Sequence, residues 1–273
     1  MKTKSLNSRL VFIILFLLFA ELTKATTYYV SNNGSDSNTG ISPSEAYEHI
    51  QFGIAFLQPS DTLLVLNGFY EGFKISCGGE VGNPIVIMAN GDSVIINEPS
   101  SLSEESGILL ASSSGCEITG IEINGFILQG LPRHGIRAVG VHHCTIINNT
   151  ATDNVFDGIQ LGVTSDVVVE RNTCFNNRVG INFGDENFNP IIKNNQSFNN
   201  DLSGIQTDGD GFIIFEAVID GNEVFGNNSG AGINIHNISN SLIINNLSYN
   251  NSCLLYTSPS PRDRTRSRMP SSA

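Results

Sequence analysis

The stretch that decides the fold is Gly158-Ile159-Gln160-Leu161-Gly162-Val163-Thr164-Ser165-Asp166-Val167-Val168-Val169-Glu170-Arg171-Asn172-Thr173-Cys174-Phe175-Asn176-Asn177. It contains short runs rich in β-branched residues, and Gly or Asn residues separate these runs. Such runs favour β-strands and are too short for helices. The same plan occurs before and after this stretch, so an internal repeat organises the chain.

Two motifs mark each copy of the repeat. The dipeptide Gly-Ile occurs at steps of 28, 23, 22, 24 and 28 residues, beginning at Gly107, Gly135, Gly158, Gly180, Gly204 and Gly232. The second motif is an Asn after a β-branched run, at Asn149, Asn172, Asn195, Asn222 and Asn246. Downstream of these come Thr152, Phe175, Phe198, Phe225 and Tyr249, and then Asn154, Asn177, Asn200, Asn227 and Asn251.

A coil of about 23 residues with three short strands is typical of a parallel β-helix, in which equivalent residues stack about 4.8 Å apart. We therefore predict an all-β, three-sheet solenoid over residues 61–252. The repeated Asn should turn the chain in the left-handed conformation and bond to its copies as a buried ladder. The repeated aromatic residues should form a stack inside. Leucine-rich repeats are disfavoured because the consensus is Ile and Asn rather than spaced Leu.

The two ends differ from this repeat. Residues 1–25 are predicted to be a signal peptide, because a basic start precedes an apolar run that is too short to span a bilayer; an uncleaved anchor is the alternative. We expect export and no later membrane span. Residues 253–273 are rich in Pro, Ser and Arg and resemble translated adapter or vector sequence. We expect a non-native or disordered tail and a truncated solenoid.

The charge of the central part excludes one class of partner. The chain has 14 Lys+Arg and 26 Asp+Glu, and each end holds four of the basic residues and one acid. Residues 26–252 therefore hold 6 basic and 24 acidic residues, a net charge of −18. Such a surface repels phosphate backbones, so we expect no nucleic-acid binding.

Residues 26–60 are expected to form an N-terminal strand and a capping helix. Ser42-Pro43-Ser44-Glu45 is typical of a helix start. An apolar stripe at helical spacing follows, at Tyr47, Ile50, Ile54 and Leu57. A solenoid needs a cover at its open end, and this helix should provide it.

Three segments carry a family resemblance: residues 28–40, the expected helix that contains Ile50-Gln51, and residues 61–70. With the Gly-Ile and Asn-Asn units, they resemble the secreted right-handed parallel β-helix proteins of the pectate-lyase-like superfamily. The resemblance covers residues 26–252 and implies a right-handed solenoid. That superfamily includes polysaccharide lyases, uronan epimerases, glycoside hydrolases, accessory proteins and adhesins, so function must be argued from a site.

In those relatives the sheet that corresponds to the Gly-Ile strands forms the floor of a carbohydrate groove. Strand alternation points each Ile inward and the next residue outward. The outward residues should form a polar strip about 20 Å long, which suits sugar hydroxyls, although any solvated sheet face carries polar residues. The strip begins at Arg137, and the predicted substrate-binding residues are Gln160, Asn182, Gln206, Asn234 and His236.

Acidic turns on two adjacent coils suggest a metal site. Their carboxylates should converge within about 5–8 Å, which predicts a Ca²⁺ site. In polyuronate lyases of this fold, calcium neutralises the substrate carboxylate, and it would also let an acidic protein bind an acidic polymer. An acid–base pair for glycoside hydrolysis and ordinary solvated acids are the alternatives. The predicted ligands are Asp185, Glu186, Asp208 and Asp210.

Elimination or epimerisation also requires a base. The predicted catalytic residues are Arg137 on the strip, His134 on the preceding turn, and Asp208. Lys193 aligns with carboxylates on both neighbouring coils, which favours a charge ladder over a catalytic base. The Gly-His-Gly and Arg-Ile-Lys segments of polygalacturonases and the Asp-Pro-His segment of uronan epimerases are not in the sequence.

Together these patterns predict an exported monomer, secreted, periplasmic or at the cell surface, that binds an acidic polysaccharide. It would act as a calcium-assisted polyuronate lyase or, alternatively, as a non-catalytic binding, accessory or adhesin-like protein. Copper-site maturation is disfavoured because no His/Met cluster is visible and Met88 is the only Met in residues 26–252. The cysteines lack C-x-x-C spacing and fit small buried fillers better than zinc or disulfides.

Overall fold

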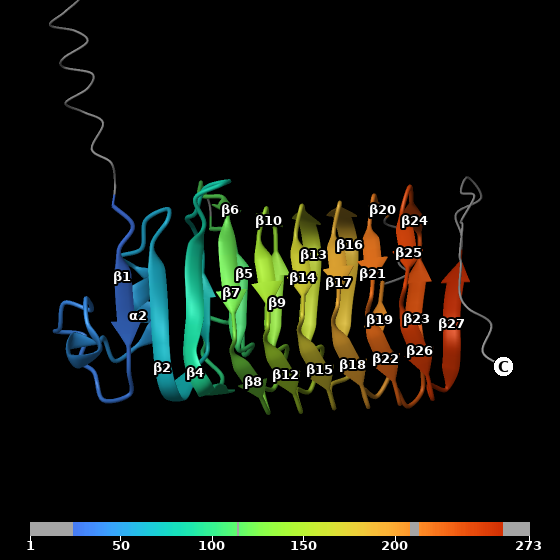
Figure 1. Cartoon of the computed structure of the whole chain (residues 1–273), viewed down its shortest axis with the longest axis horizontal. Coiled ribbons are helices and arrows are strands. Elements are labelled where there is room, and N and C mark those ends of the chain that lie inside the picture. The colour runs from blue at the N-terminus through green and yellow to red at the C-terminus, as the bar shows by residue number, and fades with distance from the viewer. Residues whose placement is uncertain (1–23, 114, 208–212, 259–273) are drawn as a thin grey trace, which may run out of the picture.

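The structure is a computed structural model that describes residues 24–113, 115–207 and 213–258, the last six by their backbone only. Figure 1 shows a row of stacked coils that runs from β1 (Thr27–Val30) to β27 (Cys253–Ser258). Every strand pairs in parallel with its counterpart on the next coil, as in β13 with β16, so the predicted β-helix is confirmed. The predicted signal peptide and residues 259–273 lie outside the described residues, apart from residues 24 and 25.

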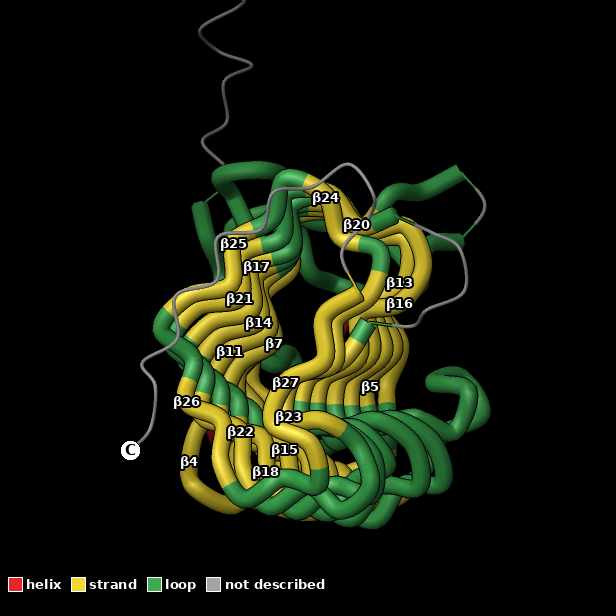
Figure 2. Tube along the Cα trace, turned by 90° about the vertical axis from the view of Figure 1, so that its right-hand side faces the viewer, coloured by secondary structure: helices red, strands yellow, loops and turns green. Residues whose placement is uncertain are grey.

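Three walls enclose the core (Figure 2). The first wall consists of β7 (Ile121–Asn124), β11 (Thr145–Ile147), β14 (Val168–Glu170), β17 (Ile191–Lys193), β21 (Val218–Asp220) and β25 (Leu242–Ile244). The second consists of β8 (Ile127–Gln129), β12 (Thr150–Thr152), β15 (Thr173–Phe175), β18 (Gln196–Phe198), β22 (Glu223–Phe225) and β26 (Leu247–Tyr249). The long strands β2 (Thr62–Glu71) and β4 (Ile85–Glu98) continue both walls at the N-terminal end.

The third wall holds the Gly-Ile strands. It consists of β3 (Phe73–Ile75), β5 (Ile108–Ala111), β9 (Ile136–Val139), β13 (Ile159–Ser165), β16 (Ile181–Phe188), β19 (Ile205–Gln206), β23 (Ala231–His236) and β27. Short strands extend its far edge, namely β6 (Ile118–Thr119), β10 (Val141–His142), β20 (Ile214–Phe215) and β24 (Ile238–Ser239). The first six residues of the predicted tail thus form a strand that pairs with β23.

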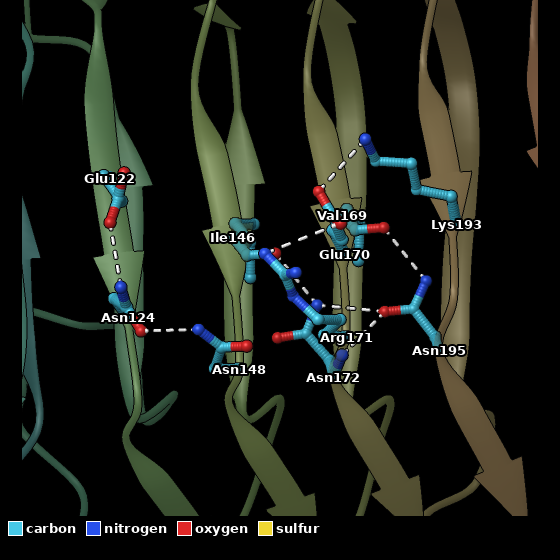
Figure 3. A network of polar contacts seen from close by, with 10 residues as sticks. All are labelled: Glu122, Asn124, Ile146, Asn148, Val169, Glu170, Arg171, Asn172, Lys193 and Asn195. Atoms are coloured by element: carbon cyan, nitrogen blue, oxygen red, sulfur yellow. Dashed lines mark hydrogen bonds and ion pairs between the residues drawn. The ribbon is translucent and has the colours of Figure 1, made fainter.

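Two Asn ladders run along the inside of the coils. Asn149 donates from Nδ2 to Oδ1 of Asn172 (3.1 Å), and Asn172 donates in the same way to Asn195 (3.1 Å; Figure 3). The backbone N–H of Asn172 also donates to Oδ1 of Asn195, at 2.9 Å. The second ladder repeats this pattern from Asn154 to Asn251. The predicted buried ladder is confirmed.

The predicted double role of each ladder Asn is wrong. The left-handed residue is the one before it, and φ lies between 53° and 64° at Asn148, Arg171, Asn194, Gly221 and Asn245. Two adjacent residues at each corner therefore share the two roles that were predicted for one Asn. One takes the left-handed turn with its side chain outside, and the next points its amide into the core.

The aromatic stack forms, but on the outside of the second wall. Phe175, Phe198, Phe225 and Tyr249 stack with centroids 4.8–5.0 Å apart. Strand alternation explains the side, because their neighbours Cys174, Ser197 and Val224 are fully buried.

Four of the five cysteines lie in residues 26–252, and these four divide into two pairs. Cys77 and Cys116 form a disulfide, which corrects the expectation that all four are fillers. Cys144 and Cys174 are free and buried, as expected.

The N-terminal cap is shorter than the apolar stripe predicts. Pro43–Glu45 forms a 3-10 turn, and α2 covers only Ile50–Ile54. Between them Tyr47 bonds to the backbone of Tyr29 and Ser31, which holds this part of the chain extended. Helix α2 contacts β1, β2 and β3, and Ile50 is buried.

Candidate functional site

The predicted polar strip forms as a row across the third wall. Arg137 pairs in register with Gln160, Gln160 with Asn182, Asn182 with Gln206, and Gln206 with Asn234. The preceding Ile residues point inward and are fully buried: Ile136, Ile159, Ile181, Ile205 and Ile233. The row is not uniformly open, because Asn182 is 3% exposed and Gln206 is 9% exposed.

Arg137 is held from two sides. Its Nε donates to Oε1 of Gln160 on the next coil, at 3.0 Å. Its Nη1 donates to Oε2 of Glu104, a residue of the loop before β5, at 2.5 Å. The guanidinium side chain is still 26% exposed, so its position at the head of the row is open to solvent.

A buried carboxylate lies beside the row. The side chain of Asp157 is 2% exposed and occupies the turn before β13. Its Oδ2 accepts a hydrogen bond from Nδ2 of Asn182 (3.1 Å) and lies 3.5 Å from Nδ1 of His134. Its Oδ1 lies 3.6 Å from Nη1 of Arg178. Asp157 therefore ties together groups from three successive coils.

His134 is neutral at pH 7. Burial, and then the positive charges of Arg137, Arg133 and Arg178, lower the pKa of its imidazole to about 3. Its ring lies 5.5 Å from that of Phe156, and the Cζ atom of Arg133 lies 6.0 Å from the same Phe156 ring.

We call Arg133, Arg137 and Arg178, with the side chains of Asp157 and His134, the arginine cluster. Three of the six basic residues of residues 26–252 meet here. The structure thus brings together two predicted catalytic residues, Arg137 and His134. Sequence analysis missed Asp157 and Arg178, although Asp157 directly precedes a Gly-Ile motif, at the repeat position that His134 occupies one coil earlier.

The first acidic turn is a bulge in β16, three residues along the strand from Asn182, the middle residue of the row. Asp185 and Glu186 lie opposite the single residue Val163, where the register between β13 and β16 shifts. Both acids are exposed. Asp185 lies over Gly162, since a Cβ added to Gly162 would come 3.1 Å from its Oδ2. Val163 itself has φ of 53°, a strained value for a β-branched residue.

The second acidic turn lies outside the described residues. It contains Asp208 and Asp210, both predicted calcium ligands, and Asp208 is also a predicted catalytic residue. In the described ranges, no three His, Cys, Asp or Glu residues lie close enough to hold a metal ion. His236 lies at the end of β23, where its N–H donates to Oγ1 of Thr207, at 2.6 Å.

Lys193 lies on the first wall, away from the row. Its Nζ is 3.1 Å from Oε2 of Glu170 (Figure 3), and it stacks in register between Glu170 and Asp220. The predicted charge ladder is confirmed.

The parallel coils with their inward Ile residues and outward polar row define a right-handed parallel β-helix of the pectate-lyase-like type. Residues 60–264 match the family described as periplasmic copper-binding protein (NosD). The chain belongs to this family. Its description as periplasmic agrees with the predicted export.

Solved structures share the fold at low sequence identity. Pectate lyase Pel9A aligns with a TM-score of 0.63 and 17% identity over 80% of this chain and 63% of that one. The GH136 lacto-N-biosidase from Eubacterium ramulus aligns with a TM-score of 0.62 and 15% identity over 92% of this chain. This chain therefore spans about three fifths of the length of these two proteins, 63% and 60%.

Within the part of the chain that the structure describes, no helix is long and apolar enough to cross a membrane.

Proposed function

We propose that this protein is an exported, monomeric β-helix, periplasmic, secreted or at the cell surface, that binds an acidic polysaccharide along the polar row. The observation that carries the proposal is the arginine cluster, a local gathering of positive charge on a protein whose residues 26–252 carry a net charge of −18. Guanidinium groups bind carboxylates with directed, charge-assisted hydrogen bonds. A sugar acid therefore finds its counter-charge beside the partly exposed amides of Gln160 and Asn234, which suit its hydroxyls.

The second candidate is a calcium-assisted polyuronate lyase, and the exposed carboxylates of the Asp185 bulge favour it. Asp185 and Glu186 supply two hard oxygen ligands, and a complete calcium site requires Asp208 and Asp210 as well. The lyase proposal is weaker in its catalytic base, the group that must remove a proton from the substrate. Arg137 is already paired with Glu104, and an imidazole with a pKa of about 3 accepts a proton poorly. We therefore place binding ahead of elimination, with hydrolysis and epimerisation behind both.

The copper in the family description does not fit the residues of this chain. Cys77 and Cys116 are joined, and burial raises the thiol pKa values of Cys144 and Cys174 to about 11 and 12. All five His residues lie in the described ranges, where no metal-binding group of three forms. Soft sulfur and imidazole ligands are what copper selects, so we derive no step through it.

The decisive experiment measures binding of tetragalacturonate and of a neutral tetrasaccharide to the full chain by calorimetry, with and without Ca²⁺. Arg178→Gln should weaken binding of the acidic chain by about 10-fold or more, because it removes one charge-assisted contact. The matched control is Arg171→Gln, which removes the same charge from an exposed corner of the first wall. Equal effects of the two variants would contradict the site.

The same samples test the lyase. Elimination would produce an unsaturated uronate, which is detected by its ultraviolet absorbance. A product that appears only with calcium supports the second candidate, and binding without product supports the first.

A further inference from the structure

The loop between β4 and β5 crosses the head of the polar row. The Oγ atom of Ser103 lies against Gly72, just before β3, at 2.7 Å from an added Cβ. The next residue, Glu104, reaches Arg137 on β9. Strand β5 lies between β3 and β9, so the loop passes over it. This explains why Leu109, in register with Lys74 and Arg137 on the outward side, is fully buried.

A buried side chain and its hydrogen bonds hold the loop in place. Ser103 is fully buried, and its single O–H lies within hydrogen-bonding distance of the carbonyl oxygens of Ser106 (2.5 Å) and Ser100 (3.0 Å). Glu104 and Glu105 follow it with φ of 51° and 64°, the left-handed region that is unfavourable for a non-glycine residue. Such strain persists where the surroundings hold it in place, and it is common at binding sites.

The ion pair between Glu104 and Arg137 has the same chemistry as the contact expected between Arg137 and a sugar acid. A carboxylate oxygen of Glu104 accepts a hydrogen bond from Nη1 of Arg137, as the carboxylate of a sugar acid would. The Glu104 side chain is 50% exposed and that of Arg137 is 26% exposed, so the pair can open without disturbing the core. Pairs this exposed contribute little net stability, which leaves them easy to displace.

We propose that Glu104 is a specificity-determining residue that occupies the Arg137 position until an acidic chain displaces it. This inference rests on the proposed function. A small free anion gains only the contact with Arg137 and must overcome the tethered Glu104. A polymer held at the same time by Gln160 and Arg178 brings its carboxylate at a high effective concentration. Glu104 therefore makes the site prefer a polyacid over a monomeric acid.

The test compares Glu104→Gln and Glu104→Ala with the control Glu105→Gln, which removes the same charge from the adjacent exposed residue. Calorimetry with galacturonate monomer and tetragalacturonate gives the affinity for each, and thermal unfolding confirms that each variant is folded. Both Glu104 variants should bind the monomer about fivefold more tightly than the wild type, which is the effect expected from loss of an exposed ion pair. The ratio of the affinity for the tetramer to the affinity for the monomer should therefore be smaller in these variants. The control should match the wild type.

The outcomes separate this inference from the proposed function. If the wild type binds the tetramer and the Glu104 variants match Glu105→Gln, the inference is wrong and the proposed function stands. Weaker binding in the Glu104 variants would show that Glu104 contacts the ligand, which also overturns the inference. If neither the wild type nor any variant binds either ligand, both proposals fail.

Discussion

The side chain of Asn195, in the middle of a ladder, uses all of its hydrogen-bonding capacity on the coils around it. The Oδ1 atom of Asn195 accepts from both N and Nδ2 of Asn172, and its own Nδ2 donates to Oδ1 of Asn222 and to the carbonyl of Val169. Asn195 is 1% exposed, so water cannot replace these partners. A buried polar group that loses its partner costs about 1–3 kcal/mol.

Asn195→Ala should therefore lower the free energy of unfolding by about 3 kcal/mol or more, because several buried groups lose partners at once. Urea unfolding followed by circular dichroism measures the change. The control is Asn228→Ala, which deletes the same amide from an exposed position and should change stability by no more than about 0.5 kcal/mol. Similar losses in the two variants would show that the ladder is not a major source of stability.

At the scale of the element, two histidines, one in a turn before a Gly-Ile strand and one in the N-terminal cap, have pKa values shifted in opposite directions. His134 is buried among three arginines, which lowers its pKa to about 3. His49, in the cap, lies 2.7 Å from Asp36, and this hydrogen bond raises its pKa. The folded protein therefore binds fewer protons at His134, and more at His49, than the unfolded chain does.

The consequence is a predicted pH dependence. As pH falls from about 6.5 towards 3, the unfolded chain protonates His134 while the folded protein does not, so stability falls. His134→Gln should flatten the acid side of the profile of unfolding temperature against pH. His49→Gln should do the opposite, because the stability from that pair is present at low pH and is lost as pH rises past its raised pKa. Parallel profiles for His134→Gln and the wild type would refute this account.

At the scale of the molecule, the repeat explains which features the sequence could predict. Stacking turns a position in the period into a neighbour in space, so the Asn ladders and the row from Arg137 to Asn234 follow from spacing alone. The contact between Glu104 and Arg137 joins an irregular loop to a regular strand, and the Cys77–Cys116 disulfide joins segments 39 residues apart. Neither contact repeats, so no periodic pattern predicts it.

The whole chain should also bind no copper with high affinity. Its imidazoles are scattered and partly engaged, as in His142, whose Nδ1 lies 2.7 Å from Oγ of Ser165, and the free thiols of Cys144 and Cys174 are buried. Titration with Cu(I) and Cu(II) against a competing chelator should show no stoichiometric uptake, and thermal stability should not rise with either ion. A saturable site that raises the unfolding temperature would reject this expectation.

The ladders also have a direction. Along the first ladder each Asn Oδ1 accepts from the preceding coil, beginning with the Phe126 N–H, and Nδ2 of each Asn from Asn149 to Asn222 donates one hydrogen bond to the Asn Oδ1 of the following coil. The amide dipoles therefore align head to tail and polarise one another, so that each added coil strengthens those before it. Opening one coil in the middle would break this alignment on both sides. The aligned amide dipoles therefore favour cooperative unfolding of the whole solenoid.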